Sequence, residues 1–289
     1  MKSFHTIFII VLFINSQVAA QDNCLDFDGN DDWVNVPSQD LTGMSQLTLE
    51  TLVYADDITS SYWSEIYRQN GSGIPAAYLL AFQNNGTILS FGVNTSTGYL
   101  ELDVNITPNT YVGSWHHIAG VYDGTTMILY VDGNPIGSSN HSGTLSMSSP
   151  TTHRIGVNVS AEYIDARIDE VRLWTVARSQ GDIINNKDCA LYGPINGLVA
   201  VYNFNETSGT NAADGSGNGF DGTLMNGPVW VGSTVAVNCN AGLEDLSNNE
   251  KVLVKIVDFM GRETEFKPNT PLIFIYSDGT RERVMKLED

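Results

Sequence analysis

The fold is decided by residues 115–136, which read WHHIAGVYDGTTMILYVDGNPI. Successive side chains of a β-strand point to opposite faces. His117 therefore shares one face with Trp115 and Ala119, whereas His116 shares the other with Ile118. Two adjacent histidines of one strand cannot bind the same metal ion, and the apolar neighbours predict that His117 is a buried, hydrogen-bonded strand residue. The stretch predicts architecture, not a metal or acid–base centre.

Turn signals bracket the second half of this stretch. Asp123-Gly124 and Asp132-Gly133 supply the left-handed backbone that tight turns require, so residues 127–131 form a strand between two hairpin turns. Similar apolar and aromatic runs, separated by Gly, Asn, Asp and Ser, recur along the chain and predict strands at 24–27, 33–36, 47–54, 64–69, 77–83, 87–93, 100–104, 115–122, 127–131, 153–156 and 166–174. Many short strands with a single short helical pattern near 177–186 indicate an all-β sandwich or barrel.

Residues 1–20 have the layout of a cleavable signal peptide. Lys2 precedes an apolar run at 7–14, and small residues at Ala19 and Ala20 form a cleavage site. The run is too short to span a bilayer, and no later segment approaches a transmembrane span. We expect cleavage near Ala20; the alternatives are an N-terminal anchor or a buried helix.

The charge is distributed unevenly. Residues 21–250 carry six Lys and Arg against 26 Asp and Glu, a net charge of −20, whereas residues 251–289 carry seven of each. Such an acidic body would repel phosphates, which argues against nucleic acid as a partner. It suits cation binding, although it could equally serve only to keep a secreted protein in solution.

The chain contains three cysteines, Cys24, Cys189 and Cys239, and none of them belongs to a C-x-x-C pair. An extracytoplasmic setting permits a disulfide, and the odd count leaves one thiol over. We favour a Cys189–Cys239 disulfide because these two cysteines flank a segment of their own, but the sequence does not determine the connectivity.

Four separated motifs carry a family resemblance: CLDFDGNDDWVNVP, LTLETLVYAD, GSWHHIAGVYDGTTMILYVDGNPIGSS and ARIDEVRLWTVARSQGDI. In this order, over residues 24–184, they resemble a secreted bacterial laminin-G-like, concanavalin A-type jelly-roll domain. Residues 197–230 resemble a block that often accompanies it; the alternative is a Gly/Asn-rich linker, but leaving Val199 and Trp230 in water would be costly. The resemblance implies an all-β, two-sheet antiparallel jelly-roll sandwich, frequently with a structural calcium and a carbohydrate-related role.

Calcium prefers six to eight oxygen ligands, and the segment DFDGNDD supplies several around a flexible glycine. Related folds bring this segment close to the RIDE motif. We therefore predict a calcium site formed by Asp28, the carbonyl of Gly29, Asp31 and Asp169. The alternative is an Asx turn without metal. Asp214 and Asp221 could form a second oxygen cage, although such loops more often only turn.

Catalysis has little support in the sequence. The glucanases of the wider fold resemble E-x-D-x-x-E or E-x-D-x-E, and the nearest match here is ELDVN, with Glu101 and Asp103 on one strand face. Asn105 replaces the third acid, which removes the proton donor that departure of the leaving group requires. Two exposed acids on a solvent face are the favoured interpretation.

Aromatic residues in polar, loop-like segments are candidates for sugar binding, because rings stack on the C–H faces of sugars. Tyr62 and Trp63 in TSSYWSEIY and Tyr163 in SAEYIDA fit this description, although packing is an equal alternative for the first two. Three further tryptophans lie within strand motifs and are predicted to be core: Trp33, Trp115 and Trp174.

Residues 251–289 form a separate unit with balanced charge and a strand–turn–strand pattern. The blocks VDFMGRE, PNTPLIFIY and SDGTRERV resemble the short form of the C-terminal sorting domain of the type IX secretion system of Bacteroidetes. The Pro-Asn-Pro segment of the longer form is missing, and an ordinary small β domain is the alternative. The resemblance implies export by the type IX translocon to the outer cell surface or the medium.

The sequence thus predicts a signal peptide (1–20), a jelly-roll domain (21–240, with core motifs at 24–184 and an accessory strand block at 185–240), a linker (241–250) and a C-terminal sorting domain (251–289). We expect a secreted or cell-surface module that binds a glycan or mediates adhesion and holds a structural calcium. The alternatives are a glycoside hydrolase of the same fold and a structural surface protein without a glycan ligand.

Overall fold

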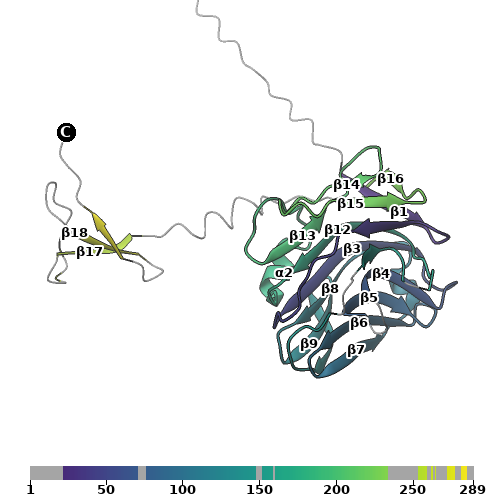
Figure 1. Ribbon diagram of the computed structural model, residues 1–289, viewed down its shortest axis with the longest axis horizontal. Coiled ribbons are helices and arrows are strands. Elements are labelled where there is room, and N and C mark those ends of the chain that lie inside the picture. The colour runs from purple at the N-terminus through teal and green to yellow at the C-terminus, as the bar shows by residue number, and fades with distance from the viewer. Residues whose placement is uncertain are drawn as a thin grey trace, which may run out of the picture.

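The computed structural model describes residues 22–70, 76–147, 152–158, 160–233, 253–258, 262, 264, 272–276 and 281–284. The predicted signal peptide and the predicted linker lie outside these residues. Within the described part of the chain, no helix is both long and apolar enough to cross a membrane. The described strands form two large sheets and one small one (Figure 1).

The first large sheet, sheet A, has the order β10-β9-β8-β3-β12-β1-β16, with β13 also paired to β12. Its strands are β1 (Asn23–Asp28), β3 (Leu47–Asp57), β8 (Trp115–Tyr122), β9 (Thr126–Val131), β10 (Asn134–Asn140), β12 (Asp165–Trp174), β13 (Leu198–Tyr202) and β16 (Val229–Gly232). Residues 115–136 form β8, β9 and the start of β10. The backbone is left-handed at Asp132 and Gly133, as the hairpin turn between β9 and β10 requires.

The second large sheet, sheet B, has the order β14-β15-β2-β11-β4-β5-β6-β7. Its strands are β2 (Trp33–Val36), β4 (Trp63–Asn70), β5 (Tyr78–Gln83), β6 (Ile88–Thr95), β7 (Gly98–Asn105), β11 (Thr152–Ile155), β14 (Asn211–Ala212) and β15 (Gly222–Met225). The accessory block at 197–230 therefore consists of ordered strands, as predicted, and it extends both sheets. This arrangement confirms the predicted two-sheet antiparallel sandwich.

The core lies between the two sheets. Tyr122 and Phe27 of sheet A belong to the same buried cluster as Phe82 and Phe91 of sheet B. A Cβ atom at Gly120 of β8 would lie 2.3 Å from the ring of Phe91, so the sheets approach closely where β8 carries no side chain. Burial of this apolar surface is the main source of stability.

The outward face of sheet A is covered by the short helix α2 (Gln180–Asn186). Ser179 and Asp182 form a capping box at its start, and Ile183 packs on Ala119 and Val121. The prediction of a short helix near 177–186 is therefore confirmed. A second helix, α1 (Pro108–Tyr111), is a single turn.

His117 is buried beneath this cover, as predicted, but the expected hydrogen bonds of its ring are missing. Its backbone N–H donates to Asp132 Oδ1 at 2.9 Å. Neither ring nitrogen has a hydrogen-bond partner; Nε2 lies 3.6 Å from Glu50 Oε2. Burial lowers the pKa of His117 to about 4.

Two details differ from the expectations. The polar strand β10 was not predicted, because it contains Pro135 and Gly137; it lies at the edge of sheet A, where proline and a register shift are tolerated. Of the three tryptophans predicted to be core, Trp174 is buried, whereas Trp33 and Trp115 are half-buried. The guanidinium carbon of Arg154 lies 4.8 Å from the ring centre of Trp33.

Residues 251–289 contribute a separate antiparallel sheet of three strands: β17 (Leu253–Val257), β18 (Leu272–Tyr276) and β19 (Arg281–Val284). These strands fit the predicted strand–turn–strand pattern of the tail. Several residues of the sorting-domain motifs, among them Gly261 and Pro268, lie outside the described residues.

Candidate functional site

The outward face of strands β4 to β7 gathers polar side chains around small ones, and we call it the β4–β7 face. In β5, Leu80 and Phe82 belong to the core, so Leu79, Ala81 and Gln83 lie on the opposite face of the strand. Seven further residues of the neighbouring strands lie on this face: Trp63, Glu65, Arg68, Ser90, Tyr99, Glu101 and Asp103.

A bulge in β4 places both members of a buried ion pair on the β4–β7 face. The register between β4 and β5 shifts between Glu65 and Tyr67, so Glu65 pairs with Ala81, and Arg68 pairs with Leu79. Arg68 Nη1 donates to Glu65 Oε1 at 2.7 Å. Burial raises the pKa of Glu65 to about 7, against the opposing charge of Arg68. Glu65 Oε2 is buried without a hydrogen-bond partner.

The two carboxylates of the ELDVN motif lie across the same face, on β7. Tyr99 donates its hydroxyl hydrogen to Glu101 Oε2 at 2.7 Å, and the side-chain amide of Gln83 donates to Glu101 Oε1. Ser90 donates to Asp103 Oδ1 at 2.7 Å. Both oxygens of Glu101 are thus bound by neighbours, and Asp103 is exposed.

Two of the three predicted aromatic residues, Tyr62 and Trp63, lie beside these polar groups. Trp63 is paired with Gln83 in the register of β4 and β5, and its ring centre lies 6.2 Å from that of Tyr62, which is 57% exposed. Tyr163 is half-buried in the connection between β11 and β12. It follows Glu162, whose charge is close enough to raise the pKa of Glu65 further. The structure therefore places Trp63 on the β4–β7 face and the ring of Tyr62 beside it, whereas Tyr163 belongs to a separate connection, where it is bridged to Val157.

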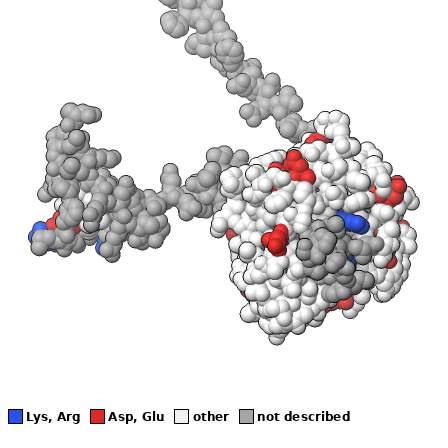
Figure 2. Space-filling model, in the orientation of Figure 1, with Lys and Arg blue, Asp and Glu red and all other residues white. Residues whose placement is uncertain are grey.

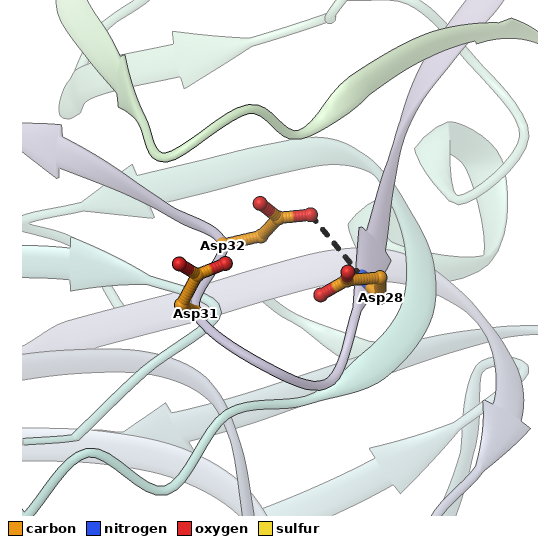
Figure 3. A group of neighbouring side chains, drawn as sticks. All are labelled: Asp28, Asp31 and Asp32. Atoms are coloured by element: carbon orange, nitrogen blue, oxygen red, sulfur yellow. Dashed lines mark hydrogen bonds between the residues drawn. The ribbon is translucent and has the colours of Figure 1, made fainter.

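The acidic segment DFDGNDD covers the end of β1 and the turn from β1 to β2, and we call it the acidic turn (Figure 3). Carboxylate oxygens of Asp28, Asp31 and Asp32 lie within 4.8 Å of one another. Asp28 Oδ1 accepts a hydrogen bond from the backbone of Asn30 at 2.9 Å, and Asp32 Oδ2 accepts one from the backbone of Asp28 at 3.3 Å. Hydrogen bonds from Asn30 lower the pKa of Asp28.

Gly29 is required in the acidic turn, because its φ is +74° and a Cβ atom there would lie 2.9 Å from Cβ of Asp165.

The predicted calcium ligands are only partly brought together. The acidic turn places Asp28, Gly29 and Asp31 close to one another, but Asp169 is not among them. Asp28 pairs with Asp165, so Asp169 is four residues further along β12, about 13 Å away at the rise of an extended strand. The four predicted ligands therefore do not form a single site.

Asp169 instead lies at the point where β12 changes neighbours. Along one edge of β12, β1 pairs with residues 165–168 and β13 pairs with residues 171–174. Asp169 and Glu170 fall between the ends of β1 and β13, and we call this point the fork. Both side chains are fully buried. Burial raises the pKa of each of them, and their mutual repulsion and the charge of Asp22 raise the pKa of Asp169 further.

The remaining predicted sites have simple outcomes. Asp214 accepts hydrogen bonds from the backbones of Ser216 and Phe220, and Asp221 accepts one from the backbone of Asp214, so the second oxygen cage is a network of turns. Cys24 is a buried free thiol. Cys239 lies outside the described residues, so the Cys189–Cys239 disulfide stays a prediction.

Sequence reasoning noted Glu170 in the RIDE motif as an oxygen donor, but it missed Glu65 on the β4–β7 face and Asn203, which lies opposite Glu170 at the fork. Glu65 stands two positions after Trp63 in a predicted strand, and this spacing could have placed the two side chains on one face. Asn203 gave no such signal. The juxtaposition of Asn203 and Glu170 depends on the strand order around β12, which no local pattern encodes.

The comparisons with known proteins agree with this architecture. The model of the concanavalin A-like lectin/glucanases superfamily, of the laminin G type, matches residues 28–184, more than half of the chain. The chain therefore belongs to this family. A search of curated protein sequences finds no significant match.

Two solved structures illustrate the likeness. One is a Bacteroides ovatus protein provisionally described as carbohydrate binding, with a TM-score of 0.57 and 18% identity over 76% of this chain and 62% of that chain. The other is the heptameric SAP-like pentraxin of Limulus polyphemus, with a TM-score of 0.51 and 16% identity over 76% of this chain and 100% of that chain. At such identities the likeness supports the sandwich fold and nothing finer.

Proposed function

We propose that the protein is a carbohydrate-binding module whose binding surface is the β4–β7 face. The observation that carries the proposal is the exposed ring of Tyr62 beside the half-buried ring of Trp63, at the edge of a face that presents carboxylates and an amide. Rings of this kind stack on the apolar C–H faces of sugars, while carboxylate and amide groups pair with hydroxyls. The description of the Bacteroides ovatus structure points in the same direction.

The test is a glycan array followed by titration of the best oligosaccharide against matched variants. Trp63→Ala should weaken binding by about 2 kcal/mol, roughly 30-fold, if the ring is a binding hot spot. Tyr62→Ala should also weaken it. Tyr192 is the matched control, because it is likewise 57% exposed and belongs to a different loop. Loss of binding in Tyr192→Ala with retention in the other two variants would move the binding site away from this face.

A hydrolase is the second candidate, favoured by one observation. Burial raises the pKa of Glu65 to about 7, so the group gains and loses its proton near neutral pH, and it lies close enough to Glu101 to be affected by its charge. An acid of this kind could protonate a leaving group. Release of reducing sugars from a bound polysaccharide, abolished by both Glu65→Gln and Glu101→Gln, would establish this function. The hydrogen bonds that occupy both oxygens of Glu101 favour binding instead.

Export is the third part of the proposal. The tail motifs resemble a type IX sorting domain, and the described part of the tail is a small antiparallel sheet. We expect that deletion of residues 251–289 retains the protein inside the outer membrane, whereas the full chain reaches the cell surface or the medium. Immunoblotting of cell fractions measures this directly, and unchanged export would refute it.

A further inference from the structure

The fork on β12 contains two buried carboxylates, and each of them has one oxygen without a hydrogen-bond partner. Asp169 Oδ1 accepts a hydrogen bond from the backbone of Glu170 at 2.8 Å, and Glu170 Oε2 accepts one from Arg172 at 3.0 Å. The second oxygen of each carboxylate, Asp169 Oδ2 and Glu170 Oε1, is buried without a hydrogen-bond partner. Leaving such acceptors unpaired is costly, so the arrangement calls for a ligand.

A third unsatisfied oxygen comes from the neighbouring strand. Tyr202 of β13 pairs with Val171, so the next residue, Asn203, lies opposite Glu170. The Asn203 amide nitrogen donates to the carbonyl of Leu191 at 3.1 Å, which fixes the orientation of the amide. Its Oδ1 is buried without a partner, and the residue is 5% exposed.

The charge at the fork is also incompletely balanced. Asp22 acts electrostatically on both Asp169 and Glu170. Arg172 is shared, because its Nη1 lies 3.5 Å from Glu50 on the other side of β12 while its Nη2 binds Glu170. A further positive charge would stabilise buried carboxylates in this excess.

Local backbone geometry supports a built site. Glu170 has a φ of +51°, and the register between β12 and β3 shifts between Asp169 and Arg172. A left-handed non-glycine residue in a bulge is strained, and such strain is concentrated at functional sites. The bulge places two successive acids at the fork.

An open cleft of about 260 Å³ lies on the adjoining loops, lined in part by Asn203 and Glu206. Glu206 Oε2 is a further buried oxygen without a partner. The cleft gives an ion a route from solvent to Asn203 and leaves room for bound water.

We propose that the fork binds one calcium ion through Asp169 Oδ2, Glu170 Oε1 and Asn203 Oδ1. A site composed entirely of oxygens selects a hard cation, and calcium accepts six to eight oxygens in irregular geometry, with water completing the shell. The ion joins the end of β13 to the bulge of β12 and thereby ties the accessory strand block to the jelly roll. This inference is independent of the glycan-binding proposal.

The experiment uses the full chain, stripped of metal with a chelator and titrated calorimetrically with calcium chloride. We expect one binding event per chain. At calcium concentrations 100 times the dissociation constant, the melting temperature should rise by roughly 5–10 °C. Absence of both heat and shift in the unaltered protein would refute the proposal.

Matched variants distinguish the fork from the acidic turn. Asp169→Asn and Asn203→Ala should abolish the calcium-dependent shift, whereas the double variant Asp28→Asn/Asp31→Asn should retain it. The opposite pattern would place the ion at the acidic turn and overturn the proposal.

A comparison without calcium separates ion binding from a folding defect. Asp169→Asn replaces a carboxyl whose charged form is disfavoured by burial with an amide of nearly the same shape, so the variant in chelator should melt no lower than the unaltered protein in chelator. If the melting temperature of Asp169→Asn is lower than that of the unaltered protein by the same amount with and without calcium, Asp169 has only a structural role. That outcome would contradict the proposal.

Discussion

The acidic turn and the fork both contain neighbouring carboxylates, but they differ in their surroundings. In the turn, Asp28 and Asp31 are exposed, and the carboxylates of Asp28 and Asp32 accept hydrogen bonds from backbone N–H groups. In the fork, Asp169 and Glu170 are fully buried, and each has one oxygen without a partner. Water can satisfy the first group, whereas the second depends on the protein or on a ligand.

This difference shows that a dense acidic motif is a poor guide to a cation site. On the face of the body seen in Figure 2, acidic side chains form small separate patches rather than one concentrated surface. The residues most in need of a cation are those removed from solvent. Three substitutions test the contrast between buried and exposed charge, in order of decreasing effect.

The largest effect is expected for Arg172→Met. The guanidinium is fully buried and contacts Glu170 and Glu50, so its removal leaves two buried carboxylates less compensated. We expect a loss of about 3–5 kcal/mol in the free energy of unfolding, measured with urea. Arg167 is the matched control on the same strand; its ion pairs with Asp26 and Asp56 are one-third exposed, so Arg167→Met should cost about 1 kcal/mol or less. Equal losses of unfolding free energy in the Arg172 and Arg167 variants would contradict the expected difference between buried and exposed charge.

An intermediate effect is expected for the pH dependence of stability in Glu65→Gln. The pKa of Glu65 is raised from 4.5 to about 7, so the folded state binds the proton more tightly than the unfolded state. Its stabilising contribution is therefore fully present below pH 4.5 and is lost as the pH rises through 7. Relative to the unaltered protein, the variant should gain about 3 kcal/mol between these values. Parallel stability curves from pH 4 to 8 would contradict this prediction.

The smallest effect is expected for Asp28→Asn. Asparagine retains the oxygen that accepts the hydrogen bond from Asn30, and the residue is exposed. We expect a change within about 0.5 kcal/mol in thermal or urea unfolding, with and without calcium. A loss of several degrees that appears only when calcium is present would show that the acidic turn binds the ion after all.

Much of the fold could be predicted because its signals are local. The alternation in 115–122 and the Asp132-Gly133 turn indicate a hairpin from neighbouring residues alone. The strand β10 could not be recognised in the same way, because its polar residues gain a strand conformation only from pairing with β9 at the sheet edge. His117 was correctly placed on a buried face, but its neighbour Glu50 comes from another strand.

The candidate site was predicted in part. Tyr62 and Trp63 were identified as candidates for sugar binding and Glu101 only as a weak catalytic candidate; the structure brings Trp63 and Glu101 to one face, with the ring of Tyr62 beside Trp63. Glu65 was missed because the local sequence does not show that a bulge in β4 brings Arg68 to the same face, where the two side chains form an ion pair.

The sequence by itself determined the class of the fold, the short helix and the ordered accessory strands, since strand alternation and turn chemistry act over a few residues. Only the tertiary structure decided which acids meet. Asp169 was predicted to join Asp28, yet strand pairing separates them along β12 and brings Asn203 to Glu170 instead. The physical reason is that strand order is set by burial of the whole sandwich, so contacts between distant segments are properties of the complete fold.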